Sequence, residues 1–339
     1  MSSENNSTIQ YSSDFLFIYE AAQCNPNGDP DQENKPRMDY DTKTNLVTDT
    51  RVKRFIRDYL KAINEEELIF VDMEGDSKVS VDSKLKAVVK RTIEKKDELE
   101  NALSHNSDAL DTYKKIIEKS NGDIEQVWKV ITDKKFKQKE INYELLAYLV
   151  KEKFIDIRMF GSAFAVGGFT KAYTGAIQLN WGYSLNKVEL MDSNSIVTIM
   201  ADDSSTFGKD YRVHYSLLAF NGTINRTAAN TTGLTNDDVE VFRDAIWKSI
   251  PATPTRSKLN QYPKLYVEIK YKENGTNGQF GDLRNYVETT PKDGIAAKQV
   301  RRFKDLFFDT SALSELIREH DDLIEEVIIK TSPDVTFTA

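Results

Sequence analysis

The sequence predicts an α+β fold with the element order β-α-β-β-α-β, interrupted by a large helical insertion. An aromatic-rich strand pattern at 14–23 precedes an amphipathic helix pattern that ends near Ile63. Period-two strand patterns return only from residue 155, and a second amphipathic helix follows Thr235. Between these parts, 73–154 consists almost entirely of charged, amphipathic helix patterns. The resulting order is that of ferredoxin-like folds, which RNA-recognition modules share.

Composition excludes several classes of protein. The 339 residues are enough for two domains, 39% of them are hydrophobic, and the mean hydropathy is −0.53. No apolar run approaches the roughly 18–20 residues that span a bilayer, so we expect no membrane partner. Residues 1–13 are polar, we expect them to be disordered, and they lack the regions of a secretory signal. We therefore expect a cytoplasmic protein.

The first strand and the first helix carry distinct signals. Residues 14–23 place apolar side chains on both faces, as in the centre of a sheet. The next segment, 24–45, is rich in Pro, Gly, Asn and Asp, which predicts ordered turns. Thr48 can cap the helix that follows, whose apolar stripe is Val52, Phe55, Ile56, Tyr59, Leu60 and Ile63.

Beyond the insertion, alternation predicts the remaining strands. In 155–166 one face is apolar, and the other carries Asp156, Arg158, Phe160, Ser162 and Phe164. Further strand patterns lie at 176–184, 195–201, 211–221, 265–272 and 325–329. Thr235 and Asp238 resemble a capping box at the start of the second helix, and a last helix is expected near 313–320.

The motifs of several enzyme classes are absent from the sequence. The chain has no phosphate-binding GxxxxGK[ST], no GxSxG, no HExxH and a single cysteine, Cys24. Its three histidines are scattered, so we expect no metal and no cofactor. Asp29, Asp31, Asp39 and Asp41 are the best candidates for holding a divalent ion. Because Pro and Gly interleave them, we prefer to interpret these aspartates as turn formers.

A basic helix is the strongest binding signal. Residues 51–61 carry five basic residues and one acid, although the whole chain has a net charge of −8. Lys53, Arg54 and Arg57 lie opposite the apolar stripe, where they can neutralise phosphates. Arg158, Arg212 and His214 are expected on polar strand faces, where an open sheet would suit single-stranded RNA. The alternative for the basic helix is an ordinary solvated helix face. The alternative for Phe160 and Phe164 is burial beneath the helical insertion.

An acidic stretch lies near the end of the chain. Residues 305–326 carry eight acids and only Arg318 as a base. This excess of charge can simply promote solubility. Alternatively, it meets a basic surface on a neighbouring copy, head to tail.

Several segments together resemble a known family. They are NPNGDPD at 25–31, KPRMD at 35–39, LVTDTRVKRFIRDYL at 46–60, DIRMFG at 156–161, TGAIQ at 174–178 with Trp181, and KDYRVHYSLL at 209–218. These segments resemble the Cas7 family, the repeated backbone subunit of type I CRISPR Cascade complexes. The resemblance extends from about residue 14 to 272, and the large insertion favours the I-B branch over the related I-C form.

The resemblance implies an architecture and partners that the pattern alone does not. It implies an RRM-like palm (14–72 and 155–339), finger-like helices in the insertion (73–154) and a thumb hairpin (about 167–210). Copies would stack head to tail along a single-stranded CRISPR guide RNA, beside other Cascade subunits. The guide would then pair with a target DNA strand in short segments, because the thumb flips a nucleotide out at intervals.

The resemblance also assigns binding residues. The loop 25–37 and the helix 51–57 would line the guide-RNA groove, with Asn25, Asn27, Lys35, Arg37 and Arg51 added to the helix cations. Segments near Lys171 and around 207–209, which includes Lys209, are candidate thumb tips, and Asn225 and Arg226 lie in a loop that reaches the RNA. Members of the type I branch are not nucleases, so we expect no catalytic residue. The related type III subunits cut RNA with an aspartate in this loop, which leaves a metal-dependent ribonuclease using Asp29 and Asp31 as the alternative.

Overall fold

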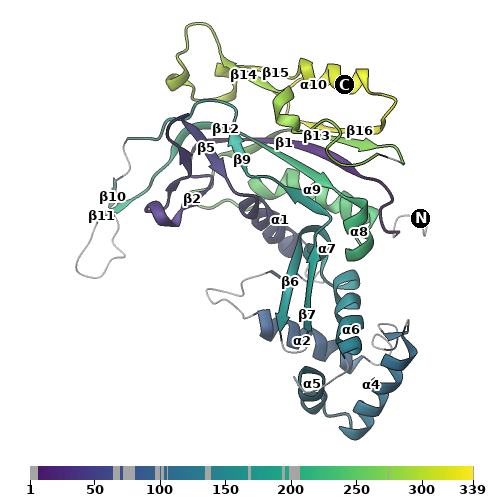
Figure 1. Cartoon of the computed structure of the whole chain (residues 1–339). Helices are drawn as coiled ribbons and strands as arrows, with labels where there is room; N and C mark the ends of the chain where they lie inside the picture. Colours follow the sequence, from purple (N-terminus) through teal and green to yellow (C-terminus); the bar gives the residue numbers. More distant parts are fainter. Residues whose placement is uncertain are drawn as a thin grey trace. The chain divides into compact units, whose positions relative to one another are not determined.

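The computed structural model of the chain describes residues 7–63, 69–71, 81–95, 100, 103–104, 106–133, 139–166, 169–192, 195–197, 207–273 and 275–338 (Figure 1). They form two compact units. The first takes in the chain as far as Ile9, Leu60–Ala176 and Arg226–Val241, and the second takes in Gln10–Tyr59, Ile177–Asn225 and Phe242–Ala339. None of the described helices combines the length and the apolar character needed to cross a bilayer.

The second unit is built on a large antiparallel sheet. Its central strand is β1 (Ser13–Cys24), which pairs with β12 (Val213–Ile224) on one side and with β13 (Gln261–Tyr271) on the other. This position confirms the expectation of a central strand. Beyond β13 the sheet continues to β16 (Ile324–Thr331). Beyond β12 it continues through β9 (Gly182–Ser184) and β5 (Thr44–Val47) to β4 (Met38–Asp39). β12 also pairs with β8 (Ile177–Leu179).

Both faces of the sheet are covered around β1. On one face, Leu16 and Ile18 share a core with α10 (Ser311–Glu319) and the hairpin of β14 (Glu288–Pro291) and β15 (Leu306–Asp309). On the other face, the Phe15 ring lies 5.5 Å from that of Phe242 on α9 (Asn236–Ala252). The prediction of an open sheet face that stacks bases is therefore wrong at these strands, because packed elements occupy both sides.

The two helices that follow the sheet strands begin as the sequence predicts. In α1 (Asp49–Ile63), the Thr48 Oγ1 accepts the Arg51 N–H at 3.3 Å, which confirms the cap. In α9, the Thr235 Oγ1 accepts the Asp238 N–H at 3.1 Å, and the Asp238 carboxylate accepts the Thr235 N–H at 3.0 Å. Asp thus takes the place of Glu in a capping box.

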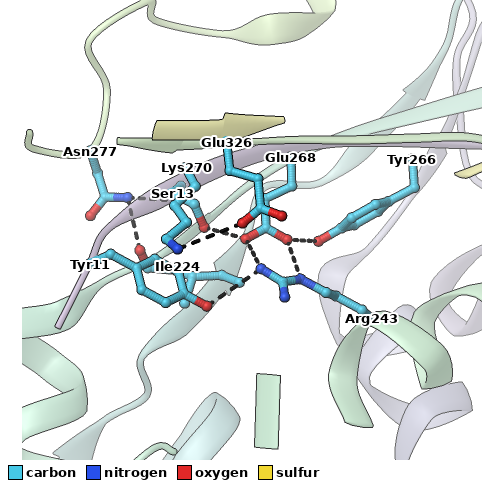
Figure 2. A network of polar contacts seen from close by, with 9 residues as sticks. All are labelled: Tyr11, Ser13, Ile224, Arg243, Tyr266, Glu268, Lys270, Asn277 and Glu326. Atoms are coloured by element: carbon cyan, nitrogen blue, oxygen red, sulfur yellow. Dashed lines mark hydrogen bonds and ion pairs between the residues drawn. The ribbon is translucent and has the colours of Figure 1, made fainter. Parts of the chain in front are cut away.

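A buried polar network joins β1, β13 and α9 (Figure 2). Glu268 of β13 is fully buried, and its two oxygens accept two hydrogen bonds from Arg243, both at 2.8 Å. Ser13 and Tyr266 donate the other two, at 2.7 and 2.6 Å. Because four donors surround this carboxylate, its charge is fully compensated inside the second unit.

The first unit is mainly helical. Its helices are α2 (Val81–Glu94), α4 (Ser107–Lys119), α5 (Ile124–Thr132), α6 (Lys139–Glu152), α7 (Ile155–Phe160) and α8 (Arg226–Thr232). A hairpin of β6 (Gly161–Val166) and β7 (Phe169–Thr174) completes it. Its core includes Tyr113, Leu145 and Phe164, and the Trp128 ring stacks on Phe169 at 5.9 Å.

The structure corrects three local predictions. Residues 155–160, expected as strand, form α7, because all six side chains are buried and a buried run shows no distinguishing alternation. Residues 7–13, expected to be disordered, are described, and Ile9 is fully buried with its N–H bonded to the Leu234 carbonyl at 3.0 Å. The apolar run at 68–72 predicts a further short strand, yet no strand forms at 69–71, and residues 68 and 72 lie outside the described part.

Short elements account for the rest of the second unit. The loop after β1 contains β2 (Gly28–Asp29), the 3₁₀ turn Pro30–Gln32 and β3 (Lys35–Pro36). A small hairpin pairs β10 (Ser195–Val197) with β11 (Phe207–Lys209), and its tip, 198–206, lies outside the described residues. Further 3₁₀ turns cover Leu283–Tyr286, Ala297–Gln299 and Phe303–Asp305.

Candidate nucleic-acid interface

The loop after β1 is held in one conformation by its own asparagines. Asn27 Oδ1 accepts both the N–H and the hydroxyl of Thr48, at 2.9 and 3.0 Å, which ties the loop to the start of α1. Asn25 is buried, and its amide donates to the Asn34 carbonyl at 2.8 Å. Gly28 lies close to Asn34: a Cβ there would lie 1.9 Å from Asn34 Oδ1 and 3.0 Å from the Asn34 carbonyl oxygen, so the Asn34 side chain would have to move. The expected ordered turn is confirmed, and two of the predicted residues, Asn25 and Asn27, fix its shape.

The cations of α1 are mostly paired within the helix. Lys53, expected on the solvent face, is buried and contacts Asp49 at 2.9 Å, because its position borders the apolar stripe. Arg54 pairs with Asp58 at 2.8 Å, and Arg57 is half-buried with partners of its own. Arg51 differs from them: its guanidinium lies 4.2 Å from the Phe55 ring centroid, and its buried Nε bonds to no described group.

A second part of the surface comes from the segment before β12. The Lys209 ammonium lies 3.2 Å from Glu33, and the Tyr211 hydroxyl donates to the same carboxylate at 2.8 Å. The Lys35 ammonium lies 5.0 Å from the centroid of the Tyr211 ring. The hydrogen bond from Tyr211, and then Lys209, lower the pKa of Glu33. This contact brings the predicted residues Lys35 and Lys209 together.

Arg212 extends the surface toward the end of α9. Its guanidinium donates to Asp210 at 2.8 Å, to the Gln23 carbonyl at 2.9 Å and to the Arg256 carbonyl at 3.3 Å. Arg256 reaches the same Asp210 at 3.0 Å and remains two-thirds exposed. One aspartate therefore serves two arginines, which leaves a net positive charge.

Lys258 lies where these parts meet. Its ammonium donates to the main-chain carbonyl of Asn25, and the Asn25 N–H donates to the Ser257 carbonyl at 2.9 Å. Burial, and then the positive charge of Arg51, lower the pKa of Lys258 to about 8. Burial also lowers the pKa of Arg51 and raises that of Cys24 to about 12. The site thus places two partly desolvated cations close together.

We call these residues the cationic cluster: Lys35, Arg37, Lys209, Arg212 and Arg256 around Arg51 and Lys258. Among the described residues, the carboxylates that form ion pairs with these cations are Asp29, Glu33 and Asp210. Arg37, 3.3 Å from Asp29, also lies 5.8 Å from the ring of Trp181, which is half exposed. Lysines and arginines beside an exposed aromatic ring such as that of Trp181 suit the phosphates and bases of a single nucleic-acid strand.

Several predicted residues do not join this cluster. Arg158 belongs to the first unit, where its guanidinium is buried and makes two 2.7 Å hydrogen bonds to Asp238. Lys171 and Arg226 also belong to that unit, and the exposed Lys171 ammonium lies 4.9 Å from the Tyr173 ring centroid. In the second unit, the Asn225 amide bonds to Asn277 at 2.8 Å. His214 is half-buried, and burial, then Arg301, lower its pKa.

The acidic loop shows turn chemistry at Asp29. Its Oδ1 accepts the Asp31 N–H at 3.2 Å, and its Oδ2 faces Arg37. Asp39 likewise accepts the N–H groups of Asp41 and Thr42, at 3.0 and 3.3 Å. Within the described parts of the chain, no three His, Cys, Asp or Glu residues lie together in a way that would hold a metal.

Sequence reasoning missed Arg256, Lys258 and Tyr211. The first two lie in a short loop after α9 that has no periodicity, and only the pair of cations in PTRSK at 254–258 marks it. Tyr211 begins the strand pattern 211–221, which predicts an inward-facing side chain; it is buried, and its hydroxyl reaches Glu33. Such residues become visible only when the sheet brings the segments before β12 and β13 next to the loop after β1.

The family model for CRISPR-associated protein Cas7 matches residues 11–311. A CRISPR-associated protein Cas7 from Haloferax volcanii is 28% identical over 321 residues, covering 92% of this chain and 84% of the relative. Similar solved structures include a chain of a CRISPR RNA-guided surveillance complex in a pre-nicking state. Its sequence is 13% identical and the TM-score is 0.48, and the match covers 97% of this chain and 94% of the solved chain. A second surveillance complex shows 14% identity, a TM-score of 0.45 and coverage of 96% and 93%. Because the family model covers most of the sequence, the chain belongs to the Cas7 family of CRISPR-associated proteins.

Proposed function

We propose that this chain is a non-catalytic backbone subunit of a type I CRISPR surveillance complex in the cytoplasm. Several copies bind one guide RNA through its phosphates, stack head to tail along it beside other Cascade subunits, and present it for pairing with target DNA. The observation that carries the proposal is the cationic cluster, because it concentrates seven Lys and Arg side chains in a chain whose net charge is −8. Family membership supports it independently.

The fold supports an RRM-like palm. The elements β1, α1, β9, β12, α9 and β13 follow the order β-α-β-β-α-β, and their strands lie side by side as β13-β1-β12-β9. The β10–β11 hairpin is the candidate thumb, and the helices α2, α4, α5 and α6 are the candidate fingers. The size of the helical part favours the I-B branch.

Phosphate binding requires no catalysis. In an RNA-guided complex the guide recognises the target sequence by base pairing. The protein therefore needs contacts to the RNA backbone rather than to base edges. Asp29 engages Arg37 and caps its own turn, which supports a structural role over metal-dependent cleavage of RNA. Magnesium-dependent cutting of a paired RNA that disappears in Asp29→Ala would contradict the non-catalytic assignment.

Native mass spectrometry on single-stranded RNAs of increasing length tests the assembly. We expect the mass to rise by one subunit for each fixed increment of RNA. One copy at every length would make the chain an ordinary RNA-binding module and would overturn the proposal.

A matched pair of variants tests the cluster. Arg51→Gln/Lys258→Gln should weaken binding of a short RNA on the order of 100-fold, because hydrogen bonds to charged groups contribute about 1.5–3 kcal/mol each. It should also flatten the salt dependence for every RNA sequence alike. Lys187→Gln/Lys248→Gln removes the same charge outside the cluster and should bind as the wild type does.

A further inference from the structure

A second basic surface lies far from the cationic cluster in the sequence. Residues 292–304, between β14 and β15, carry five cations and one acid, Asp293. We call Lys292, Lys298, Arg301, Arg302 and Lys304 the basic loop. Lys292 is half-buried and the other four are exposed. Among the described residues, only Arg302 of this set forms an ion pair: its Nε lies 3.0 Å from Asp305 Oδ1.

The basic loop is held in a defined shape. Asp305 is buried, its carboxylate accepts the Arg301 N–H at 2.9 Å, and its carbonyl accepts the Lys292 N–H at 2.9 Å. Val300 and Phe303 anchor the loop in the core beneath the sheet. Arg301 donates to the carbonyls of Lys298 and Val300, which fixes the turn but leaves its charge uncompensated. The cations are therefore presented by a folded element.

An apolar centre adjoins the basic loop. Phe307 is 52% exposed, and the Lys292 ammonium lies 5.6 Å from its ring centroid. A groove of about 590 Å³ runs along Phe307 and Lys304 to Pro333 and Val335. Interfaces between proteins commonly combine such an aromatic centre with a charged rim.

The opposite charge is presented by α10 and the turn that follows it. Leu313, Leu316 and Ile317 bury one side of α10, so its acids face solvent. We call Glu315, Glu319, Asp321, Asp322 and Glu325 the acidic end: all five are exposed, and none forms an ion pair with a described residue. Lys272 holds the turn through the main-chain carbonyls of residues 321 and 322, at 2.9 and 3.1 Å, and not through their carboxylates.

The two surfaces lie at different ends of the same layer of the second unit. In Figure 1 the loop joining β14 to β15 extends from one end of that layer, and α10 with the turn before β16 forms the other. No ion pair joins the basic loop to the acidic end in the described part of the chain. Each set of charges is therefore available to a partner of the opposite sign.

We propose that the basic loop of one copy binds the acidic end of the next copy. The chain carries both halves of the contact, in similar numbers of charges and on different patches. Such a contact is heterologous, so it propagates along a row of copies instead of closing a pair. The inference rests on the proposed function, since it specifies the surfaces through which guide-bound copies meet. It also names a basic surface that complements the acidic stretch of the sequence.

Charge reversal with complementation tests the contact. Lys298→Glu/Lys304→Glu changes the formal charge of the basic loop from +5 to +1, and Asp321→Lys/Asp322→Lys changes that of the acidic end from −5 to −1. On a long RNA, each variant alone should add a second copy on the order of 100-fold more weakly than the wild type, because most of the attraction between the two surfaces is then lost. An equimolar mixture of the two should restore stepwise addition with alternating subunits, as read from the two masses by native mass spectrometry.

A short RNA that holds one copy separates the possible failures. Both variants should bind it with the affinity of the wild type, which also shows that they fold. Wild-type assembly by each variant alone, or no recovery in the mixture, would overturn the proposed contact while leaving the proposed function intact. Weaker short-RNA or DNA binding by the basic-loop variant alone would instead identify the loop as a nucleic-acid site. If wild-type protein never adds a second copy, the proposed function itself fails.

Discussion

If the cationic cluster binds RNA as proposed, Lys258 couples that binding to pH. Its ammonium is half-buried against the Asn25 carbonyl and repelled by Arg51, and its pKa falls to about 8. The protonated form binds phosphate, and a bound phosphate in turn favours protonation. The free protein therefore loses one cation of the cationic cluster as the pH rises through 8.

We predict that RNA affinity falls between pH 7 and pH 9 and that the salt dependence becomes shallower by about one phosphate contact. Lys258→Gln should show the weaker affinity at both pH values and little change between them. Without RNA, the stability of the fold changes with pH in the opposite direction. The pKa of Lys258 in the folded protein lies below the usual 10.5, so the unfolded chain binds more protons between about pH 8 and 10.5. Lys258 therefore makes the free energy of unfolding rise with pH in this range. Fluorescence anisotropy at both pH values measures the RNA affinity, and urea titrations measure the free energy of unfolding.

Arg158 is a structural residue of the first unit. Removing it leaves Asp238 buried without its cation, which costs about 3–5 kcal/mol for a buried pair. We predict that Arg158→Met lowers the midpoint of thermal unfolding and leaves RNA affinity unchanged in the folded protein. Normal stability combined with weaker RNA binding would restore the role that the sequence predicted for this residue.

At the scale of elements, the Glu268 network determines how α9 is fixed to the sheet. Arg243 supplies two of the four hydrogen bonds to a carboxylate that has no access to water (Figure 2). We predict that Arg243→Met destabilises the protein by about 3–5 kcal/mol, measured by urea unfolding. Lys248→Met on the exposed side of α9 is the control and should change stability by less than about 1 kcal/mol. Equal effects of the two substitutions would mean that the network contributes little.

The helices and strands also show which parts of the fold can be predicted from sequence patterns. β1, the capped start of α1 and the Thr235–Asp238 box were predictable, because each depends on local chemistry or on burial along both faces. Residues 155–160 were not, because Asp156 and Arg158 look like an outward strand face until their buried partners are known. Likewise the composition of 24–45 predicted the ordered turns that Asn25 and Asn27 hold, whereas the place of Lys258 depends on a pairing between distant segments.

At the scale of the molecule, every member of the cationic cluster belongs to the second unit. We predict that a short RNA at 100 times its dissociation constant stabilises this unit by about 2.7 kcal/mol. Hydrogen exchange should slow at residues 24–37 and 254–260 and stay unchanged in α4 and α5. Equal protection in both units would extend the RNA site beyond the cluster.

The place of β1 in the sheet has a consequence for biosynthesis. β1 is made first, yet its neighbours in the sheet are β12 and β13, and Ser13 lies 255 residues before Glu268. At about 5–20 residues per second, a ribosome needs roughly 10–40 s to make the first 200 of those residues. Throughout that time both edges of this apolar strand lack their partners, which exposes the nascent chain to pairing with other strands and to aggregation.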